Sequence, residues 1–259
     1  MKTKFYFKRI VNDKLKLSCF ILILILQLVD LFPRILLFQY GGTPERADFN
    51  SFLANTGTNF FANSLLIWFL PLFLLLISSD DIFDDYKTGY SNILRSKWGF
   101  NSYIRVNLRK AFIISFFIIF IPLMLNLLLC HIIFYNSVYS QFDSLIYSID
   151  NNFFVLCVNH PTLANIFFIF MTSFIAGLLG MASSSIALAL HDRKKVYPIS
   201  FVIWLIPLCV NRPLNLSFQP FTEYSLSYVL PTYLTTCSLY ILITIILYLG
   251  INYYEKKNN

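Results

Sequence analysis

The stretch Asp80–Lys110, DDIFDDYKTGYSNILRSKWGFNSYIRVNLRK, lies between two apolar runs, Phe60–Ser79 and Ala111–Phe134. Each run is about long enough to cross a bilayer, because about 20 helical residues span roughly 30 Å of hydrocarbon. The stretch carries four aspartates in its first part and six Lys or Arg residues behind them. A membrane protein that concentrates charge in one connecting segment is expected to bind a partner there. The alternative is a solvated loop whose charges only fix the topology.

Composition extends this pattern to the whole chain. Of the 259 residues, 57% are hydrophobic and only 13% are charged, which is typical of an integral membrane protein. The apolar runs show no alternation of the kind seen in barrel strands, so we expect helices. The sequence therefore predicts an all-α fold, a six-helix transmembrane bundle over residues 18–259. The other four predicted spans are Leu17–Phe38, Leu163–Leu190, Val196–Val210 and Leu230–Tyr253.

The distribution of Lys and Arg predicts the orientation. With both termini in the cytoplasm, seventeen of the twenty Lys and Arg residues lie on the cytoplasmic side, as the positive-inside rule requires. Residues 80–110 and 191–195 are then inner loops. The net charge of +7 follows from this bias, and it indicates contact with anionic membrane lipids and no nucleic acid.

Two segments are predicted to lie in the membrane interface. Residues 1–17 place Tyr6, Phe7 and Ile10 on one helical face and basic residues, Lys16 among them, largely opposite. This favours an amphipathic helix on the inner leaflet, and a merely basic tail is the alternative. Residues 211–231 mix aromatic and polar residues, which suits an outer re-entrant segment or a plain loop.

Polar residues inside the spans are candidates for a transport pathway, because ionisable groups are costly in hydrocarbon. Asp30 and Arg34 are four residues apart on one helical face, with Pro33 between them. They are expected either to pair with each other or to line a pathway, and Asn126 is the third candidate.

Small residues recur along the fourth predicted span, where they allow helix backbones to approach closely. The usual consequence is helix packing within the chain, and a dimer seam or a conduit wall is the alternative. The predicted packing residues are Ala176, Gly177, Gly180 and Ser184.

Catalytic motifs are absent from the sequence. It has no GxxxxGK[ST] phosphate loop, no GxSxG elbow and no HExxH pair, so the chain is not expected to be an enzyme or to bind a cofactor or metal. Two alternatives stay open: an intramembrane enzyme built on Asp30, Asn126 and His131, and a metal bound between Cys130–His131 and Cys157–His160.

The charged stretch resembles the first cytoplasmic loop of ABC-2 type permeases, the membrane subunits of bacterial ATP-binding cassette (ABC) exporters. The matching residues are Asp85-x-x-x-Gly89, Asn92-Ile-Leu-Arg95, Tyr103 and the pair Arg109–Lys110, although Asn107 stands where a Lys is common. The resemblance implies a coupling helix that docks on a separate ATPase subunit, with a second contact at residues 191–195.

The resemblance also implies the partners and the location. The ATP and Mg²⁺ would be bound by the ATPase subunit, and a second permease chain would complete a homo- or heterodimer in the bacterial plasma membrane. Such a transporter would export an amphipathic or hydrophobic peptide, toxin or drug. A non-transporting membrane scaffold or immunity protein is the alternative. The residues expected to contact the ATPase are Asp84, Asp85, Gly89, Asn92, Leu94, Arg95, Tyr103, Arg193 and Lys194.

Overall fold

The computed structural model describes residues 9, 12–40, 45–54, 60–137, 140, 151–209, 214, 218–222 and 224–258. Every regular element in these ranges is a helix, which confirms the all-α class. The elements in chain order are α2 (Lys14–Gln39), η1 (Ala47–Asn50), α3 (Phe60–Leu74), η2 (Leu75–Ser79), α4 (Asp80–Lys87), α5 (Tyr90–Trp98), α6 (Phe100–Ile133), α8 (Asn152–Asn159), α9 (Pro161–Leu190), α10 (Arg193–Cys209) and α11 (Leu226–Asn258).

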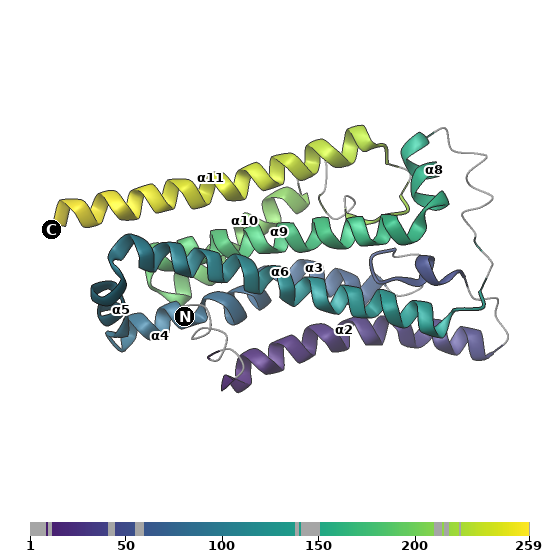
Figure 1. Cartoon of the computed structure of the whole chain (residues 1–259), viewed down its shortest axis with the longest axis horizontal. Coiled ribbons are helices and arrows are strands. Elements are labelled where there is room, and N and C mark those ends of the chain that lie inside the picture. The colour runs from purple at the N-terminus through teal and green to yellow at the C-terminus, as the bar shows by residue number, and fades with distance from the viewer. Residues whose placement is uncertain are drawn as a thin grey trace.

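The long helices lie side by side in one bundle, with α5 at one end and α8 at the other (Figure 1). We call these the α5 end and the α8 end. Within the described residues, five helices are long and apolar enough to cross a membrane. They are Lys14–Leu36, Ala62–Lys87, Phe100–Ile133, Pro161–Leu190 and Leu226–Lys257.

The predicted fifth span corresponds to α10, which is too short to join that set. It has 17 residues and contains Pro198 and Pro207. At a rise of 1.5 Å per residue it reaches about 26 Å, less than the roughly 30 Å of the hydrocarbon core. The count of six spans is therefore not confirmed.

Residues 80–110 are helical and do not form a loop. The helix that starts at α3 continues through the π-helix η2 into α4, and α6 begins at Phe100, well before the predicted boundary at Ala111. The breaks fall at Gly89 and Gly99, whose φ angles are 71° and 78°. Glycine adopts this left-handed region without steric cost, so these two glycines, rather than the change in hydropathy, set the ends of α5.

The predicted interfacial helix falls mostly outside the described residues, since of residues 1–11 only Arg9 is described. The described part differs from the prediction at Lys16. Lys16 is 2% exposed, whereas the flanking Leu15 and Leu17 are 59% and 45% exposed. The lysine turns inward because it has a carboxylate partner there, and the leucines face outward, as expected for a surface in contact with lipid.

The most extensive helix contact is between α6 and α9, the central pair of the bundle. A Cβ on Gly180 would lie 2.0 Å from Ser115 Oγ, and one on Gly177 would lie 2.9 Å from the Phe112 ring. Ala176 and Ser184 are buried in the same helix. The predicted packing residues thus lie at a contact within the chain, where small side chains let the backbones approach.

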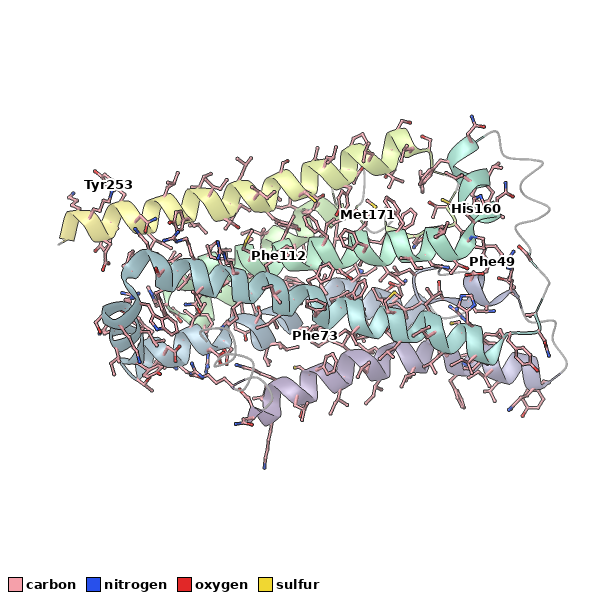
Figure 2. All side chains as sticks on the ribbon, in the orientation of Figure 1. Phe49, Phe73, Phe112, His160, Met171 and Tyr253 are labelled. Carbon is pink, nitrogen blue, oxygen red and sulfur yellow. The ribbon has the colours of Figure 1, made fainter. Side chains whose placement is uncertain are left out.

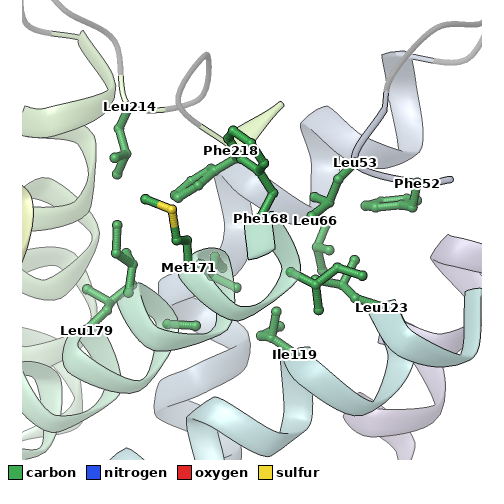
Figure 3. Close-up of a cluster of buried hydrophobic side chains, with 14 of the residues drawn as sticks. Phe52, Leu53, Leu66, Ile119, Leu123, Phe168, Met171, Leu179, Leu214 and Phe218 are labelled. Carbon is green, nitrogen blue, oxygen red and sulfur yellow. The ribbon is translucent and has the colours of Figure 1, made fainter. Parts of the chain in front are cut away.

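A large apolar core joins α3, α6 and α9, with Leu66, Ile119 and Met171 among its members (Figure 3). Helix α10 is attached to it by a hydrogen bond from Trp204 Nε1 to the carbonyl of Ile67, at 2.7 Å. Pro71 has no N–H to donate to that carbonyl four residues earlier. The buried indole therefore satisfies the carbonyl that the proline leaves free.

Helix α11 packs against α9 and otherwise exposes apolar side chains. Its exposed aliphatic residues include Leu234, Ile246 and Leu249, which are 55%, 64% and 60% exposed. A helix that exposes so much apolar surface is expected in lipid. Figure 2 places Tyr253 of α11 at the α5 end, and Phe49 of η1 and His160 at the α8 end.

Candidate functional site

A buried ion cluster fixes α4 at the α5 end of the bundle. Lys16 of α2 donates a hydrogen bond to one oxygen of Asp81, and Lys110 of α6 lies 3.4 Å from the other. Asp81 is 5% exposed and Lys110 is 6% exposed. Buried charges persist only when they are paired. Asp81 therefore connects α4 to two of the long helices.

Asp85 extends the cluster to the N-terminal segment. Its carboxylate is 2.7 Å from the guanidinium of Arg9 and is 2% exposed. Asp81 and Asp85 are four residues apart and lie on the same face of α4. The inward face of α4 is thus acidic, and the residues that cover it are basic.

The two predicted inner loops meet directly. Arg193, the first residue of α10, donates to Asp80 and to Asp84, at 2.8 Å each. The Tyr86 ring stacks on the His191 ring at a centroid distance of 4.1 Å. Burial, with a smaller effect from the positive charge of Arg95, lowers the pKa of His191. These contacts tie α4 to the end of α9 and the start of α10.

The remaining surface of α4 and α5 is exposed, and we call it the α4–α5 face. Tyr86 is 49% exposed and Ile93 is 59% exposed. Charged and polar residues surround this pair. The exposed residues of the face are Asp84, Tyr86, Lys87, Thr88, Asn92, Ile93, Ser96 and Lys97.

Three of the predicted contact residues are buried and do not belong to this face. Asp85, Leu94 and Tyr103 are 2%, 4% and 1% exposed. In this arrangement their side chains lie beneath the α4–α5 face and hold α4 and α5 on the bundle. The sequence prediction omitted Ile93, an apolar residue of α5 that is exposed although the next residue, Leu94, is buried.

The other predicted contact residues lie at or near the surface. Asp84, Asn92 and Lys194 are exposed, and Gly89, Arg95 and Arg193 are partly exposed. The Arg95 guanidinium lies over the rings of Phe100 and Tyr103, at 5.2 and 5.5 Å. Arg95 therefore holds α5 against the start of α6.

The predicted pathway residues lie together toward the α8 end, around residues 45–54. Asp30 and Arg34 pair at 3.0 Å, and Arg34 also donates to the carbonyl of Asn50. Asn126 accepts a hydrogen bond from the N–H of Phe52 at 2.8 Å. Their side chains thus hold this segment. Residues 47–54 are all buried, which nothing in their mixed polar composition predicts.

The hydrogen bonds to residues 45–54 come from the surrounding long helices. Asn165 of α9 donates to the carbonyl of Asp48 at 2.8 Å, and Asn63 of α3 donates to that of Phe52 at 3.3 Å. Irregular backbone at membrane depth requires such partners. Full burial of Phe49 or Phe52 contributes roughly 1.5–3 kcal/mol where the alternative is water. The segment is therefore an integral part of the α8 end.

The residues of the alternative intramembrane enzyme site and of the alternative metal site also lie at this end. His131 Nε2 is 3.2 Å from Asp48 Oδ1, and the thiol of Cys130 donates to the carbonyl of Asn50 at 3.2 Å. Thr162 donates to Asp48 at 2.7 Å. No group of three His, Cys, Asp or Glu residues with metal-binding geometry occurs in the described ranges. The contacts around Asp48 bind the segment to the bundle.

The structure describes residues 214, 218–222 and 224–231 of the predicted re-entrant segment. Residues 214, 218, 220 and 221 are buried near this end, whereas residues 224–227 are exposed, and the part from Leu226 onward belongs to α11. Phe218 is 1% exposed and stacks with Trp204, and Phe221 packs edge-on against Phe49 at 4.7 Å. Residues 45–54 and 218–222, which are far apart in the sequence, therefore meet at the α8 end.

The chain is 35% identical over 251 residues to the uncharacterized protein YybM of Bacillus subtilis (strain 168), an alignment that covers 97% of each protein. The chain belongs to the YybM family. No protein-family model and no solved structure matches it. The alignment with YybM extends over the whole bundle rather than one part of it. The name YybM states no activity.

Proposed function

We propose that the chain is the permease subunit of an ABC exporter of the ABC-2 type, driven by a separate ATPase subunit. The observation that carries the proposal is the attachment of α4. Asp81 joins it to α2 and α6, and Arg193 joins it to α10. A displacement of α4 by a partner would therefore move several long helices as one body, which is what alternating access requires.

The α4–α5 face has the chemistry of a protein-docking surface. Tyr86 and Ile93 supply exposed apolar area, and Asp84, Lys87 and Lys97 supply a charged rim. Protein interfaces combine an apolar centre with a polar border, and their charges guide association. In this proposal the face is cytoplasmic and contacts the ATPase.

The positions of the chain ends support six spans. Lys16 near the start of α2 contacts Asp81 at the α5 end, and Asn252 and Lys256 near the end of α11 line a pocket with Gly99 and Phe100 at the same end. A chain that begins and ends on one side crosses the membrane an even number of times. We therefore propose that α10 is a sixth, short span. Both termini are then cytoplasmic in the bacterial plasma membrane, and residues 1–17 lie in the interface.

The substrate of this proposal is an amphipathic or hydrophobic molecule such as a peptide, toxin or drug. It would leave at the α8 end, past Asp30, Arg34 and Asn126. A second permease chain, identical or related, would supply the other wall of the path, and each permease chain would contact one ATPase subunit with its bound ATP and Mg²⁺.

Affinity purification of the tagged chain from its native membrane tests the proposal. We expect an ATPase subunit with a GxxxxGK[ST] motif to copurify in near-equal amount. Ile93→Asp should abolish the association. Tyr254→Asp changes an apolar side chain that is 68% exposed on α11, and it should leave the association intact. Recovery of the functional chain without any ATPase would contradict the proposal and favour a membrane scaffold or immunity protein.

A further inference from the structure

We propose that the α8 end is a binding site for a short peptide with Phe and Leu side chains, and that residues 45–54 occupy it as a built-in ligand. The proposal goes beyond the transport function, because it requires no ATPase and concerns the opposite end of the bundle. It rests on how this segment is held.

The segment is recognised largely through its backbone. Arg34 donates to the carbonyls of Asn50 and Ser51, and Asn165 donates to that of Asp48. Asn126 accepts a hydrogen bond from the N–H of Phe52, and Asn63 donates one to the carbonyl of Phe52. These side chains come from α2, α9, α6 and α3. Main-chain contacts of this kind give affinity for a peptide whatever its sequence.

Apolar side chains of the segment enter sockets between the helices. Phe52 and Leu53 are 2% and 4% exposed and join the core cluster that contains Leu66, Leu123 and Phe168 (Figure 3). Sockets for side chains, added to contacts with the main chain, give a peptide site its specificity. The preferred ligand is therefore a turn-forming peptide with closely spaced Phe and Leu residues.

The site also has unused hydrogen-bonding capacity. Gln27 is 1% exposed, and neither atom of its amide has a hydrogen-bond partner among the described residues. The same holds for Oδ1 of Asn63, a residue that is 4% exposed and already binds the segment. Buried polar groups are almost always paired. A peptide with polar groups at this depth would pair with atoms that the built-in segment leaves free.

Cys130 provides a reporter for occupancy of the site. It is 0% exposed, and its thiol donates to the carbonyl of Asn50. In a variant with Cys19, Cys157, Cys209 and Cys237 changed to Ser, Cys130 is the only thiol. A water-soluble maleimide should label it slowly while residues 45–54 are in place.

The test adds Phe52→Ser to this single-cysteine protein in detergent, and in a second protein adds Asp48→Ala, which removes contacts at the edge of the segment and keeps both phenylalanines. We expect labelling of Cys130 to be at least tenfold faster in both. The synthetic peptide ERADFNSFLA, the sequence of residues 45–54, should restore protection at saturating concentration. A scrambled peptide of the same composition should not.

Phe167→Ser is the matched control, because Phe167 is 49% exposed on α9 and its loss should leave labelling slow. Gel filtration identifies the variants that remain folded. The proposal is overturned if the folded variants protect Cys130 as well as their parent does. It is also overturned if labelling is fast but the peptide gives no protection, or if the scrambled peptide protects equally. None of these outcomes depends on the ATPase, so this proposal and the transport proposal can fail separately.

Discussion

Asp81 shows, at the scale of single residues, how a buried carboxylate serves several helices at once. It has lysine partners on α2 and α6 and lies 3.9 Å from Arg9. The sequence predicted that the aspartates of 80–110 are important, but it assigned them to an external partner. Charge can be read from a sequence. The choice between internal and external partners depends on the fold, because residues 16 and 110 approach residue 81 only when the bundle is formed.

Replacing Asp81 tests this internal role. Asp81→Asn leaves Lys16 and Lys110 buried without their carboxylate, and breaking a buried ion pair in this way costs about 3–5 kcal/mol. Thermal unfolding in detergent should show a large loss of stability. Asp84→Asn is the control, because the Asp84 side chain is 53% exposed and the loss of such a pair costs about 1 kcal/mol or less. Equal effects of the two substitutions would contradict the role of Asp81.

Gly180 carries a second prediction at this scale. A methyl group at Gly180 would meet Ser115 Oγ at 2.0 Å and the carbonyl of Ala111 at 3.2 Å. Gly180→Ala should force α6 and α9 apart and destabilise the protein by about 1–3 kcal/mol, the usual cost of overpacking. Gly250→Ala in α11 meets nothing within 4 Å and should be neutral or slightly stabilising. The same unfolding experiment compares them, and a tolerated Gly180→Ala would show that the helices are not in close contact there.

At the scale of elements, hydropathy predicted five of the long helices but not all of their ends. It placed a boundary at Ser79 and another at Ala111, whereas the helices run on through polar sequence to Lys87 and back to Phe100. Polar residues are compatible with a helix, so a fall in hydropathy marks where the apolar environment ends. The helix itself stops where a residue such as Gly89 adopts a positive φ.

The junction between α4 and α9 is expected to respond to pH. The pKa of His191 is lowered in the folded protein, so below its ordinary value of about 6.5 the unfolded chain binds a proton that the folded chain does not. The contribution of His191 to stability is full above pH 6.5 and is lost as pH falls through the folded-state pKa. The melting temperature should therefore decrease below pH 6.5.

His191→Asn isolates this effect. The residue has φ 54°, a conformation that Asn tolerates better than most residues. The variant should lose part of the decrease in melting temperature between pH 7.5 and 5.5 that the parent shows. Identical pH profiles for the two proteins would mean that another group causes the decrease.

At the scale of the whole molecule, the sequence predicted a helical bundle with charge concentrated at one end, and the structure contains both. It did not predict that residues 45–54 fill the other end. Their contacts join residues far apart in the chain, such as Ser51 with Asn165 at 2.7 Å, and no local pattern reveals such pairs. The residues Asp30, Arg34 and Asn126 were found because polar groups in apolar runs are conspicuous, although the contacts they make could not be foreseen.

The two ends of the bundle give the protein two distinct surfaces. At the α5 end, α4 is joined by ion pairs to α2, α6 and α10, and it presents a partly apolar face with Tyr86 and Ile93 exposed. At the α8 end, buried side chains enclose a segment of the chain itself. A permease that is displaced by an ATPase at one end and binds its substrate at the other end would use both surfaces.

ATP hydrolysis by the copurified ATPase, measured in lipid nanodiscs with and without this chain, tests the coupling role of the α4–α5 face most directly. We predict that the chain changes the hydrolysis rate severalfold and that Ile93→Asp abolishes the change, while Tyr254→Asp preserves it. A hydrolysis rate that is the same with the intact chain, with the Ile93→Asp chain and without any chain would contradict the proposed coupling.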